Sequence, residues 1–343
     1  MDASRAALDL VTAAWRAQVV HVAATLQLPD LVAAGHRTST ALAAPTGVDA
    51  SVLRRLLRVL ALLGLFEGDD ESGYTVTALG EQFQERPGSL RDTCLLYGDE
   101  FYTAWGHAAE SFRTGVPGFE LAFGRTLIEH LGEDPGAAAR FQRSLRANSF
   151  FFDAVPDVID FSGHVVDIGG GSGQLLSTVL HAAPHVHGTY IDLQHMIPIA
   201  REHFAATIGT DRVDLVAADM FTGELPEADT YLLSRVLGDW SDDECVQLLR
   251  NIRQAMPPNA RLLIIERVVH DGRTDLLAPL WDLQLFVING GTQREYGTYL
   301  GLAARSGFEI KESLDLPMEN SVLVLVPGHQ ENSALAPGRE EKP

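Results

Sequence analysis

The feature of this sequence with the clearest chemical meaning is a run of glycines that follows a short hydrophobic segment. Residues 165–168 are mostly β-branched and predict a buried strand, and the leucine spacing of residues 174–180 predicts a helix. Gly169, Gly171 and Gly173 lie between them. Glycines let the backbone pass close to a ligand, and the first turn of a helix offers unpaired N–H groups to an anionic one. The segment therefore predicts a strand–turn–helix corner that binds a nucleotide-like ligand.

A carboxylate follows these glycines at a suitable spacing. Residues 188–191 predict a second strand that ends at Asp192, about 20 residues after the glycines, as expected of an acid that holds ribose hydroxyls. The glycine spacing is GxGxG instead of the GxGxxG of dinucleotide sites. We therefore favour a site for S-adenosylmethionine (SAM). Two alternatives remain open, namely a nicotinamide or flavin site and a turn that binds no ligand.

Alternating strands and helices continue along the chain. Residues 212–219, 228–235 and 260–266 predict further strands with helical segments between them. Such alternation predicts an α/β fold, in which a mainly parallel sheet carries helices on both faces. Asp219 ends the third strand as Asp192 ends the second, and acids at strand ends lie at the sheet edge where ligands of such folds bind.

Length and composition limit the class of protein. The 343 residues exceed one typical domain, so two domains are expected. No apolar run approaches the length of a membrane span, and no signal-peptide pattern is present. Two cysteines, Cys94 and Cys245, make no disulfide framework or metal cluster, which predicts a cytoplasmic protein. The net charge of −20 disfavours nucleic acid and anionic membranes as partners.

The N-terminal segment predicts a helix with an apolar face. Residues 4–31 are rich in alanine, and larger apolar side chains recur at three- and four-residue steps: Leu8, Val11, Trp15, Val19, Val22 and Leu26. A face of this kind must be covered by its own domain or by a second subunit. We favour the interface of a homodimer over an ordinary core helix.

The next elements predict a winged helix. Two helices over residues 38–44 and 49–60 precede a β-hairpin formed by residues 65–68 and 74–77. Such units often bind DNA. Here the tip of the wing, residues 69–71, is acidic, and phosphate attraction supplies most non-specific DNA affinity. A role in DNA binding is therefore disfavoured.

Residues 90–155 predict helices that contain many aromatic side chains: Tyr97, Phe101, Tyr102, Trp105, Phe112, Phe119, Phe123, Phe141, Phe150, Phe151 and Phe152. Any one of them is best explained as core. As a group that precedes the glycine corner, they could line a pocket for a flat substrate.

Several motifs in order carry a resemblance to a known family. The stretches 165–173, 190–193, 217–221, 232–267 and 281–291 resemble the SAM-dependent small-molecule O-methyltransferases, which include plant caffeate enzymes and bacterial antibiotic-tailoring enzymes. The resemblance covers nearly the whole chain. Within the family, SRVLGDW, PLWDLQLF and DLPME look most like bacterial phenazine methyltransferases. The resemblance implies a Rossmann-like class I methyltransferase domain behind a mainly helical winged-helix dimerisation domain.

The same resemblance implies which residues hold the cofactor. Gly169, Gly171 and Gly173 would lie under the methionine part of the cofactor, and Asp192 would bind its ribose. Asp219, Met220 and Phe221 would flank the adenine, and Ser234 and Arg235 would close over the cofactor. Ser149 would lie near its amino-acid end, and Trp240 is a further residue expected to bind the cofactor. We expect residues 1–90 to form the dimerisation domain, 91–155 a helical linker that contributes to the substrate pocket, 156–328 the catalytic domain and 329–343 a disordered tail.

One departure from the family concerns catalysis. The family's general base is a histidine before Asp-Trp, and Gly238 takes that place, before Asp239 and Trp240. Of the two glutamates that flank the histidine in the family, Glu266 is kept and Gln293 replaces the other. General-base help, worth roughly 10²–10⁴-fold, is therefore absent from its usual position, and Asp239 and Glu266 are the remaining candidates. Phenazine-type members resemble this chain in lacking the histidine.

No metal site is expected. His181, His185 and His187 are close in sequence, but they fall at a helix end and in a loop, where solvated histidines are common. The sequence thus predicts a homodimeric SAM-dependent methyltransferase that acts on an oxygen or nitrogen of an aromatic small molecule, a phenazine above all. The alternatives are a SAM-binding relative with other chemistry, such as hydroxylation or pericyclic rearrangement, and a winged-helix regulator that senses a ligand.

Overall fold

The computed structural model describes residues 2–269 and 276–328, and it divides into two compact units. The first comprises Met1–Phe150 with Gln284–Gly290, and the second comprises Phe151–Leu283 with Gly291–Pro343. The tail predicted for residues 329–343 lies outside the described residues. Each unit has its own core and is considered by itself.

The first unit opens with the predicted winged helix. Its elements are α1 (Ala3–Val11), α2 (Ala13–Thr25), α3 (Leu28–Ala33), α4 (Ser39–Thr46), α5 (Ala50–Leu62), β1 (Phe66–Glu67), β2 (Thr75–Val76) and α6 (Ala78–Glu81). β1 and β2 pair antiparallel, and their buried Phe66 joins Leu53, Leu57 and Leu60 of α5 in one core cluster. α4 continues through Pro45, past the end predicted at residue 44, and is capped by Gly47 with a φ of 68°.

The rest of the first unit is helical. It contains α7 (Arg91–Gly98), α8 (Glu100–Trp105), α9 (Ala108–Thr114), α10 (Gly118–Phe123), α11 (Leu127–Glu133), α12 (Pro135–Ala147) and the last residues of α17 (Leu277–Asn289). Phe101 and Phe119 are buried in its core with Val287, so these aromatics are core residues. Tyr102 and Phe112 are exposed. A pocket lined by the aromatic group stays a prediction.

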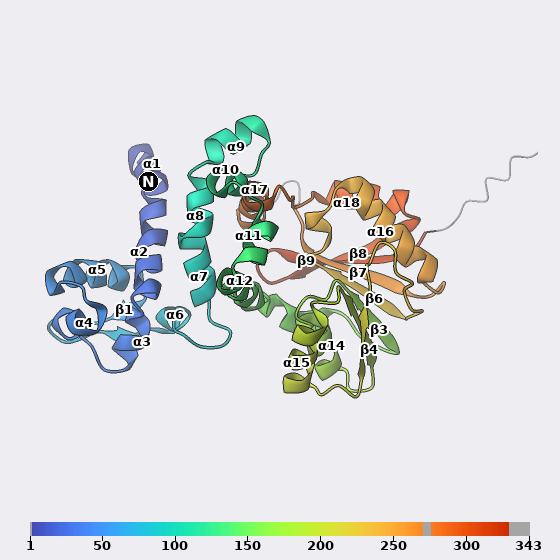
Figure 1. Cartoon of the computed structure of the whole chain (residues 1–343), viewed down its shortest axis with the longest axis horizontal. Helices are drawn as coiled ribbons and strands as arrows, with labels where there is room; N and C mark the ends of the chain where they lie inside the picture. The colour runs from blue at the N-terminus through green and yellow to red at the C-terminus, as the bar shows by residue number, and fades with distance from the viewer. Residues whose placement is uncertain (1, 270–275, 329–343) are drawn as a thin grey trace, which may run out of the picture. The chain divides into compact units, whose positions relative to one another are not determined.

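The second unit is built on a seven-stranded sheet with the order β5-β4-β3-β6-β7-β9-β8 (Figure 1). In sequence order the strands are β3 (His164–Ile168), β4 (His187–Asp192), β5 (Val213–Ala217), β6 (Thr230–Ser234), β7 (Arg261–Arg267), β8 (Phe308–Leu316) and β9 (Asn320–Pro327). The first five are parallel, whereas β9 runs antiparallel to both of its neighbours. The chain builds outward from β3 to β5 and then returns to place β6 beside β3, which creates a switch point where α/β folds bind ligands.

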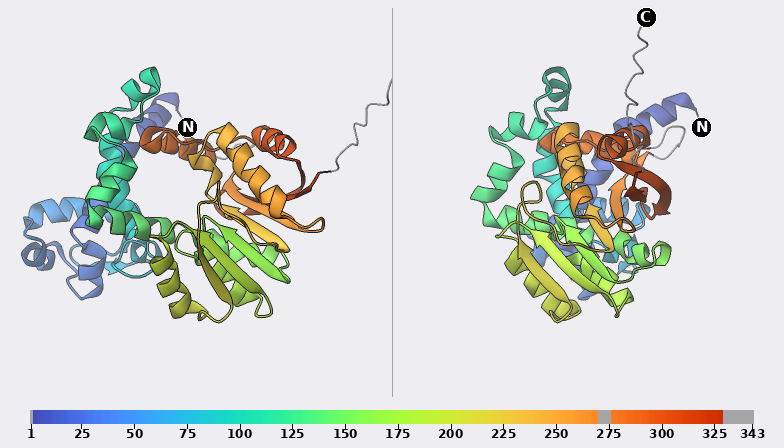
Figure 2. Two further views of the ribbon diagram at one scale, coloured as in Figure 1. Left: turned by 45° about the vertical axis from the view of Figure 1, so that its right-hand side comes forward. Right: turned by 90° about the vertical axis from the view of Figure 1, so that its right-hand side faces the viewer.

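Helices cover both faces of this sheet (Figures 1 and 2). α14 (Gln174–Ala182) and α15 (Ile197–Thr207) pack on one face, and α16 (Asp242–Ala255) and α18 (Tyr296–Arg305) pack on the other. Neighbouring strand residues point to opposite faces, so Leu232 joins the α14 cluster while Leu233 joins the α16 cluster. Burial on both faces explains why these strands are continuous hydrophobic runs. The predicted α/β fold with a helical winged-helix unit is confirmed.

Within the described part of the chain, no helix has both the length and the apolar character needed to cross a membrane. This agrees with the composition, in which charged residues interrupt every apolar run.

α1 leaves its apolar side chains in solvent within a single chain. All nine of its residues are described and none is buried, and Leu10 is 80% exposed. Trp15 of α2 is 67% exposed, and Leu8 and Val11 are also exposed. Single exposed apolar residues are common, but a contiguous patch indicates an interaction surface. We interpret this face, Leu8 to Trp15, as the contact with a second copy of the chain.

We expect the double substitution Leu8→Glu/Trp15→Glu to convert a dimer into a monomer. Each buried large apolar side chain contributes about 1.5–3 kcal/mol, and a buried unpaired carboxylate costs more. Light scattering coupled to size exclusion measures the molar mass. Met318→Glu, at an exposed apolar position of the second unit, is the control and should stay dimeric. A double variant that elutes as the wild-type dimer would show that this face does not hold the subunits together.

Candidate cofactor and active site

The glycine corner adopts the backbone conformation that its composition predicts. Gly169, Gly171 and Gly173 have φ angles of 66°, 58° and 79°, in the left-handed region that favours glycine. A Cβ atom at Gly173 would lie 2.6 Å from the ring of Phe204, whereas a Cβ at Gly171 would meet no described atom within 4 Å. The turn is therefore closed on the helix side and open at Gly171, where a ligand can approach the backbone.

Asp192 holds the glycine turn from the neighbouring strand. Its Oδ2 accepts a hydrogen bond from Gly171 N at 2.8 Å, and its Oδ1 accepts one from Leu193 N at 2.7 Å. The Tyr190 hydroxyl donates to Gly171 O. Each carboxylate oxygen accepts more than one hydrogen bond, so Asp192 keeps capacity for the two hydroxyls of a ribose.

Asp167 lies beneath the same turn. The sequence prediction of the cofactor site did not include it, although an acid inside an apolar strand is a signal of a functional residue. It is only 1% exposed, and its Oδ2 has no hydrogen-bond partner among the described residues. Burial, and secondarily the charge of Asp192, raises the pKa of the Asp167 carboxyl to about 7. A Cβ at Gly170 would lie 2.7 Å from Oδ2, so the loop tolerates no side chain there. An unpartnered buried acid suits a cationic or N–H donor group.

The residues expected around the adenine come together after β5. Ala218 N donates to Asp192 O at 3.0 Å, which joins the two acidic loops. Asp219 Oδ1 accepts from Phe221 N at 2.8 Å. The rings of Phe221 and Trp240 meet edge to face with their centroids 4.7 Å apart. Met220 and these two rings pack against one core cluster and supply apolar surface for a flat base.

The end of β6 carries backbone strain. Arg235 has a φ of 53°, which is uncommon for a residue with a side chain, and its guanidinium lies 5.2 Å from the ring centre of Phe152. Ser234 Oγ is buried without a partner among the described residues. Strain of this kind concentrates at functional sites, and these residues stand at the switch point beside β3.

Ser149 differs from the other predicted cofactor residues because it belongs to the first unit. It follows α12, and its hydroxyl donates to Leu145 O at 2.7 Å. Its assignment to the amino-acid end of the cofactor stays a prediction.

Gly238, which the family resemblance places at the position of the general-base histidine, is buried in η2 (Leu237–Asp239). Asp239 is exposed. Glu266 is 1% exposed, and its Oε1 accepts from Val236 N at 3.0 Å and from Leu237 N at 3.2 Å. Burial, and secondarily the charge of Asp239, raises the pKa of Glu266 to about 7. Glu266 thus anchors the backbone before Gly238, which favours a structural task over proton transfer.

Two further residues hold these loops, and no periodicity in the sequence singles them out. Asn251 of α16 donates from Nδ2 to Met220 O at 2.8 Å and to Gly223 O at 3.3 Å. Arg294 is buried and donates to the carbonyl oxygens of Leu237 and Trp240. Only the folded chain brings these donors to loops far away in sequence.

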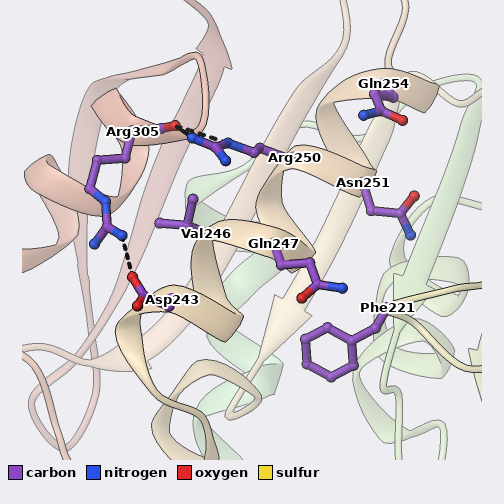
Figure 3. Close-up of a pocket in the computed structure, with 8 residues that line it drawn as sticks. All are labelled: Phe221, Asp243, Val246, Gln247, Arg250, Asn251, Gln254 and Arg305. Carbon is purple, nitrogen blue, oxygen red and sulfur yellow. Dashed lines mark hydrogen bonds and ion pairs between the residues drawn. The ribbon is translucent and has the colours of Figure 1, made fainter.

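A polar cavity of about 560 Å³ lies along the outer face of α16 (Figure 3). Gln247, Asn251 and Gln254 project from the helix, and Phe221 approaches from the loop after β5. Its charged groups are engaged, since Arg305 pairs with Asp243 at 2.5 Å and Arg250 donates to the carbonyl oxygen of Arg305. The cavity includes Phe221 but no other predicted cofactor residue, so it is distinct from the glycine corner.

No group of three or more potential metal ligands occurs among the residues that the structure describes. Two of the three histidines at positions 181, 185 and 187 have hydrogen-bond partners among the described residues. His187 Nε2 forms a hydrogen bond with Asp214 Oδ2 at 2.9 Å, and His185 Nε2 forms one with the carbonyl oxygen of Phe161 at 3.2 Å.

Comparisons with known proteins match two family models to this chain. Residues 105–309 match the O-methyltransferase domain, and residues 8–86 match the O-methyltransferase dimerisation domain. A phenazine-1-carboxylate N-methyltransferase of Pseudomonas aeruginosa is 36% identical over 325 residues, which cover 94% of this chain and 97% of that protein. A phenazine O-methyltransferase of Lysobacter antibioticus is 33% identical over 311 residues, 90% of this chain and 91% of that protein.

Solved structures agree with these matches. The human N-acetylserotonin methyltransferase in complex with SAM aligns with a TM-score of 0.86 at 26% identity, over 96% of this chain and 99% of that one. The glycine corner described above fits the same ligand. SAM carries a ribose diol for Asp192 and a cationic ammonium group that suits the unpartnered oxygen of Asp167.

We expect SAM or its product to raise the melting temperature, and Asp192→Ala to abolish this shift. At about 100 times its dissociation constant a ligand adds about 2.7 kcal/mol to the free energy of unfolding. Asp214→Ala is the control, because Asp214 lies on the neighbouring strand and forms an ion pair with exposed His187. A shift that survives in Asp192→Ala and matches that of the control would show the ribose assignment to be wrong.

Proposed function

The chain belongs to the family of SAM-dependent O-methyltransferases, and from this premise we propose that it methylates a phenazine at an oxygen or a ring nitrogen. The observation that carries the proposal is the glycine turn at the switch point between β3 and β6, with Asp167 and Asp192 beneath it. The substrate class is supported by the relatives named for phenazine N- and O-methylation, which align over nine-tenths of this chain.

Different residues of this chain would hold different parts of the cofactor. When bound, SAM supplies an electrophilic methyl group on a positively charged sulfur. Asp192 would accept from the ribose hydroxyls, and Asp167 would accept from the ammonium group. Phe221 and Trp240 would flank the adenine with apolar ring surface. Holding the reactants in line can contribute on the order of 7–11 kcal/mol, so orientation is the main catalytic task of these residues.

Gly238 bears on how the acceptor becomes nucleophilic. It has no side chain to take a proton, and Glu266 is closed to solvent with its Oε1 accepting from two backbone N–H groups. We propose that the substrate arrives as a ready nucleophile. A phenazine suits this, because its ring nitrogens carry free lone pairs and a ring nitrogen or N-oxide makes a neighbouring hydroxyl more acidic.

The direct test is incubation of the protein and SAM with phenazine-1-carboxylate and with a hydroxyphenazine. Mass spectrometry should detect a product heavier by one methyl group in place of a hydrogen, together with an equal amount of S-adenosylhomocysteine. The Asp192→Ala variant is the control and should form neither product.

The missing histidine also motivates a second candidate, a SAM-binding enzyme with other chemistry. A product with added oxygen or rearranged bonds, without S-adenosylhomocysteine, would select that candidate and refute methyl transfer.

The dependence of rate on pH separates a self-activated substrate from a protein base. With a self-activated substrate, the midpoint should follow the acceptor's own pKa and move when a ring substituent changes it. With Glu266 as base, the rate should rise with pH through a midpoint near its pKa of about 7, because only the carboxylate accepts a proton. That midpoint would be the same for every substrate.

We expect Glu266→Gln to reduce turnover by less than about tenfold, because glutamine keeps an acceptor oxygen for Val236 N and Leu237 N. Asp239→Asn, which removes the other candidate acid, is measured alongside. A loss of about a thousandfold in either variant, with S-adenosylhomocysteine binding intact and a fixed midpoint abolished, would identify that acid as the base.

A further inference from the structure

Arg294 is a buried cation whose side-chain hydrogen bonds within the described part of the chain go to one short segment and to the helix after it. It is 4% exposed. Nη1 donates to Leu237 O at 2.5 Å, Nη2 donates to Trp240 O at 2.6 Å, and Nε donates to Asp242 Oδ1 at 2.8 Å. A buried guanidinium is costly unless its donors are satisfied. Its planar fork here spans the first and last residues of the segment 237–240, which fixes their separation.

Leu237 is held from both sides by buried charges of opposite sign. Its N–H donates to Glu266 Oε1 at 3.2 Å, and its carbonyl accepts from Arg294. Cys245 Sγ also approaches that carbonyl, at 3.5 Å. Gly238 follows immediately and has no side chain of its own to anchor it. The path of the segment is therefore set by contacts to its backbone.

The residues before Arg294 are themselves fixed. Asp282 Oδ1 accepts from Gln293 N at 2.7 Å and from Thr292 Oγ1 at 2.9 Å. Thr292 N in turn donates to Gly238 O at 3.1 Å. Residues 292–294 thus form a short support, held by Asp282, that bonds the segment 237–240 at Leu237, Gly238 and Trp240.

We propose that Arg294 is a positioning residue for methyl transfer, because it fixes the backbone of Leu237–Trp240. Its contact with Trp240 O fixes the backbone of the residue whose indole meets Phe221, where the adenine would lie. Its contact with Leu237 O fixes the residue before Gly238, the position at which the family resemblance places a general-base histidine. The inference deepens the proposed function and rests on it for the identity of the reaction. In this proposal Arg294 aligns the backbone at position 238, because Gly238 has no side chain through which that backbone could be anchored.

The test compares Arg294→Met, Arg294→Lys and Arg294→Ala with Arg305→Met. Arg305 is an exposed arginine of α18 paired with Asp243, and its side chain has no recorded bond to the segment 237–240. The measurements are kcat and KM for the phenazine, the dissociation constant of S-adenosylhomocysteine by calorimetry, and the melting temperature. All kinetic and binding measurements are made well below that temperature.

We expect Arg294→Met to lower kcat about 100-fold, the cost of misplacing reacting groups by about an ångström. The dissociation constant of S-adenosylhomocysteine should rise about tenfold as Trp240 loses its fixed place. Arg294→Lys restores the charge without the fork and should recover only part of either loss. Millimolar guanidinium chloride should partly restore kcat in Arg294→Ala, whereas sodium chloride at equal ionic strength should not. Arg305→Met should match the wild type.

A purely structural role predicts a lower melting temperature with kcat and the dissociation constant unchanged, and this result would overturn the proposal. If Arg294→Met does not fold, Arg294→Lys decides, since wild-type kcat and binding in that variant would also overturn it. If the wild type methylates no phenazine, the proposed substrate is wrong. Arg294 is then judged by the binding of S-adenosylhomocysteine, where an unchanged dissociation constant in Arg294→Met refutes the positioning role.

Discussion

The hydrogen bond between Gly171 N and Asp192 Oδ2 holds the feature on which the cofactor site depends. The turn after β3 contains three positive φ angles, and such a backbone has little intrinsic preference for one path. Asp192 and Tyr190 both restrain Gly171 and lie on the same face of β4, two residues apart. Their placement follows from the register in which Ile168 pairs with Ile191. A slip of one residue would turn both side chains to the other face and release the turn.

Two buried acids lie below the loops of the site, and their energetics differ. Burial raises the pKa of both Asp167 and Glu266 to about 7, so the folded state binds these protons more tightly than the unfolded state does. Their contribution to stability is therefore complete below about pH 4 and is lost as pH rises towards 7. At neutral pH the ionised forms cost stability. Glu266 recovers part of this cost through two backbone N–H groups, while Asp167 retains an oxygen that a cationic ligand group would satisfy.

The backbone of the segment around Gly238 is held by groups from outside the segment. Its backbone contacts a carboxylate, a guanidinium and the amide of Thr292, which come from β7 and from the loop before α18. These contacts involve main-chain atoms, so they do not depend on which residue occupies position 238. The proposed use of a self-activated acceptor is compatible with this arrangement, because the backbone stays in place without a side chain at position 238.

The sequence by itself determined most of the secondary-structure elements and the glycine turn after β3. Short apolar runs that alternate with segments of helical spacing, runs of glycine and acids at strand ends follow from local chemistry, and they sufficed to predict the α/β sheet, the winged helix and the neighbourhood of Gly171 and Asp192. Only the tertiary structure decided what the buried polar groups do. Arg294, Asn251 and Glu266 act on backbone atoms of loops that are distant in the chain, and backbone acceptors carry no sequence signature. Their partners are selected by strand order and helix packing, which exist only when the whole sheet has formed.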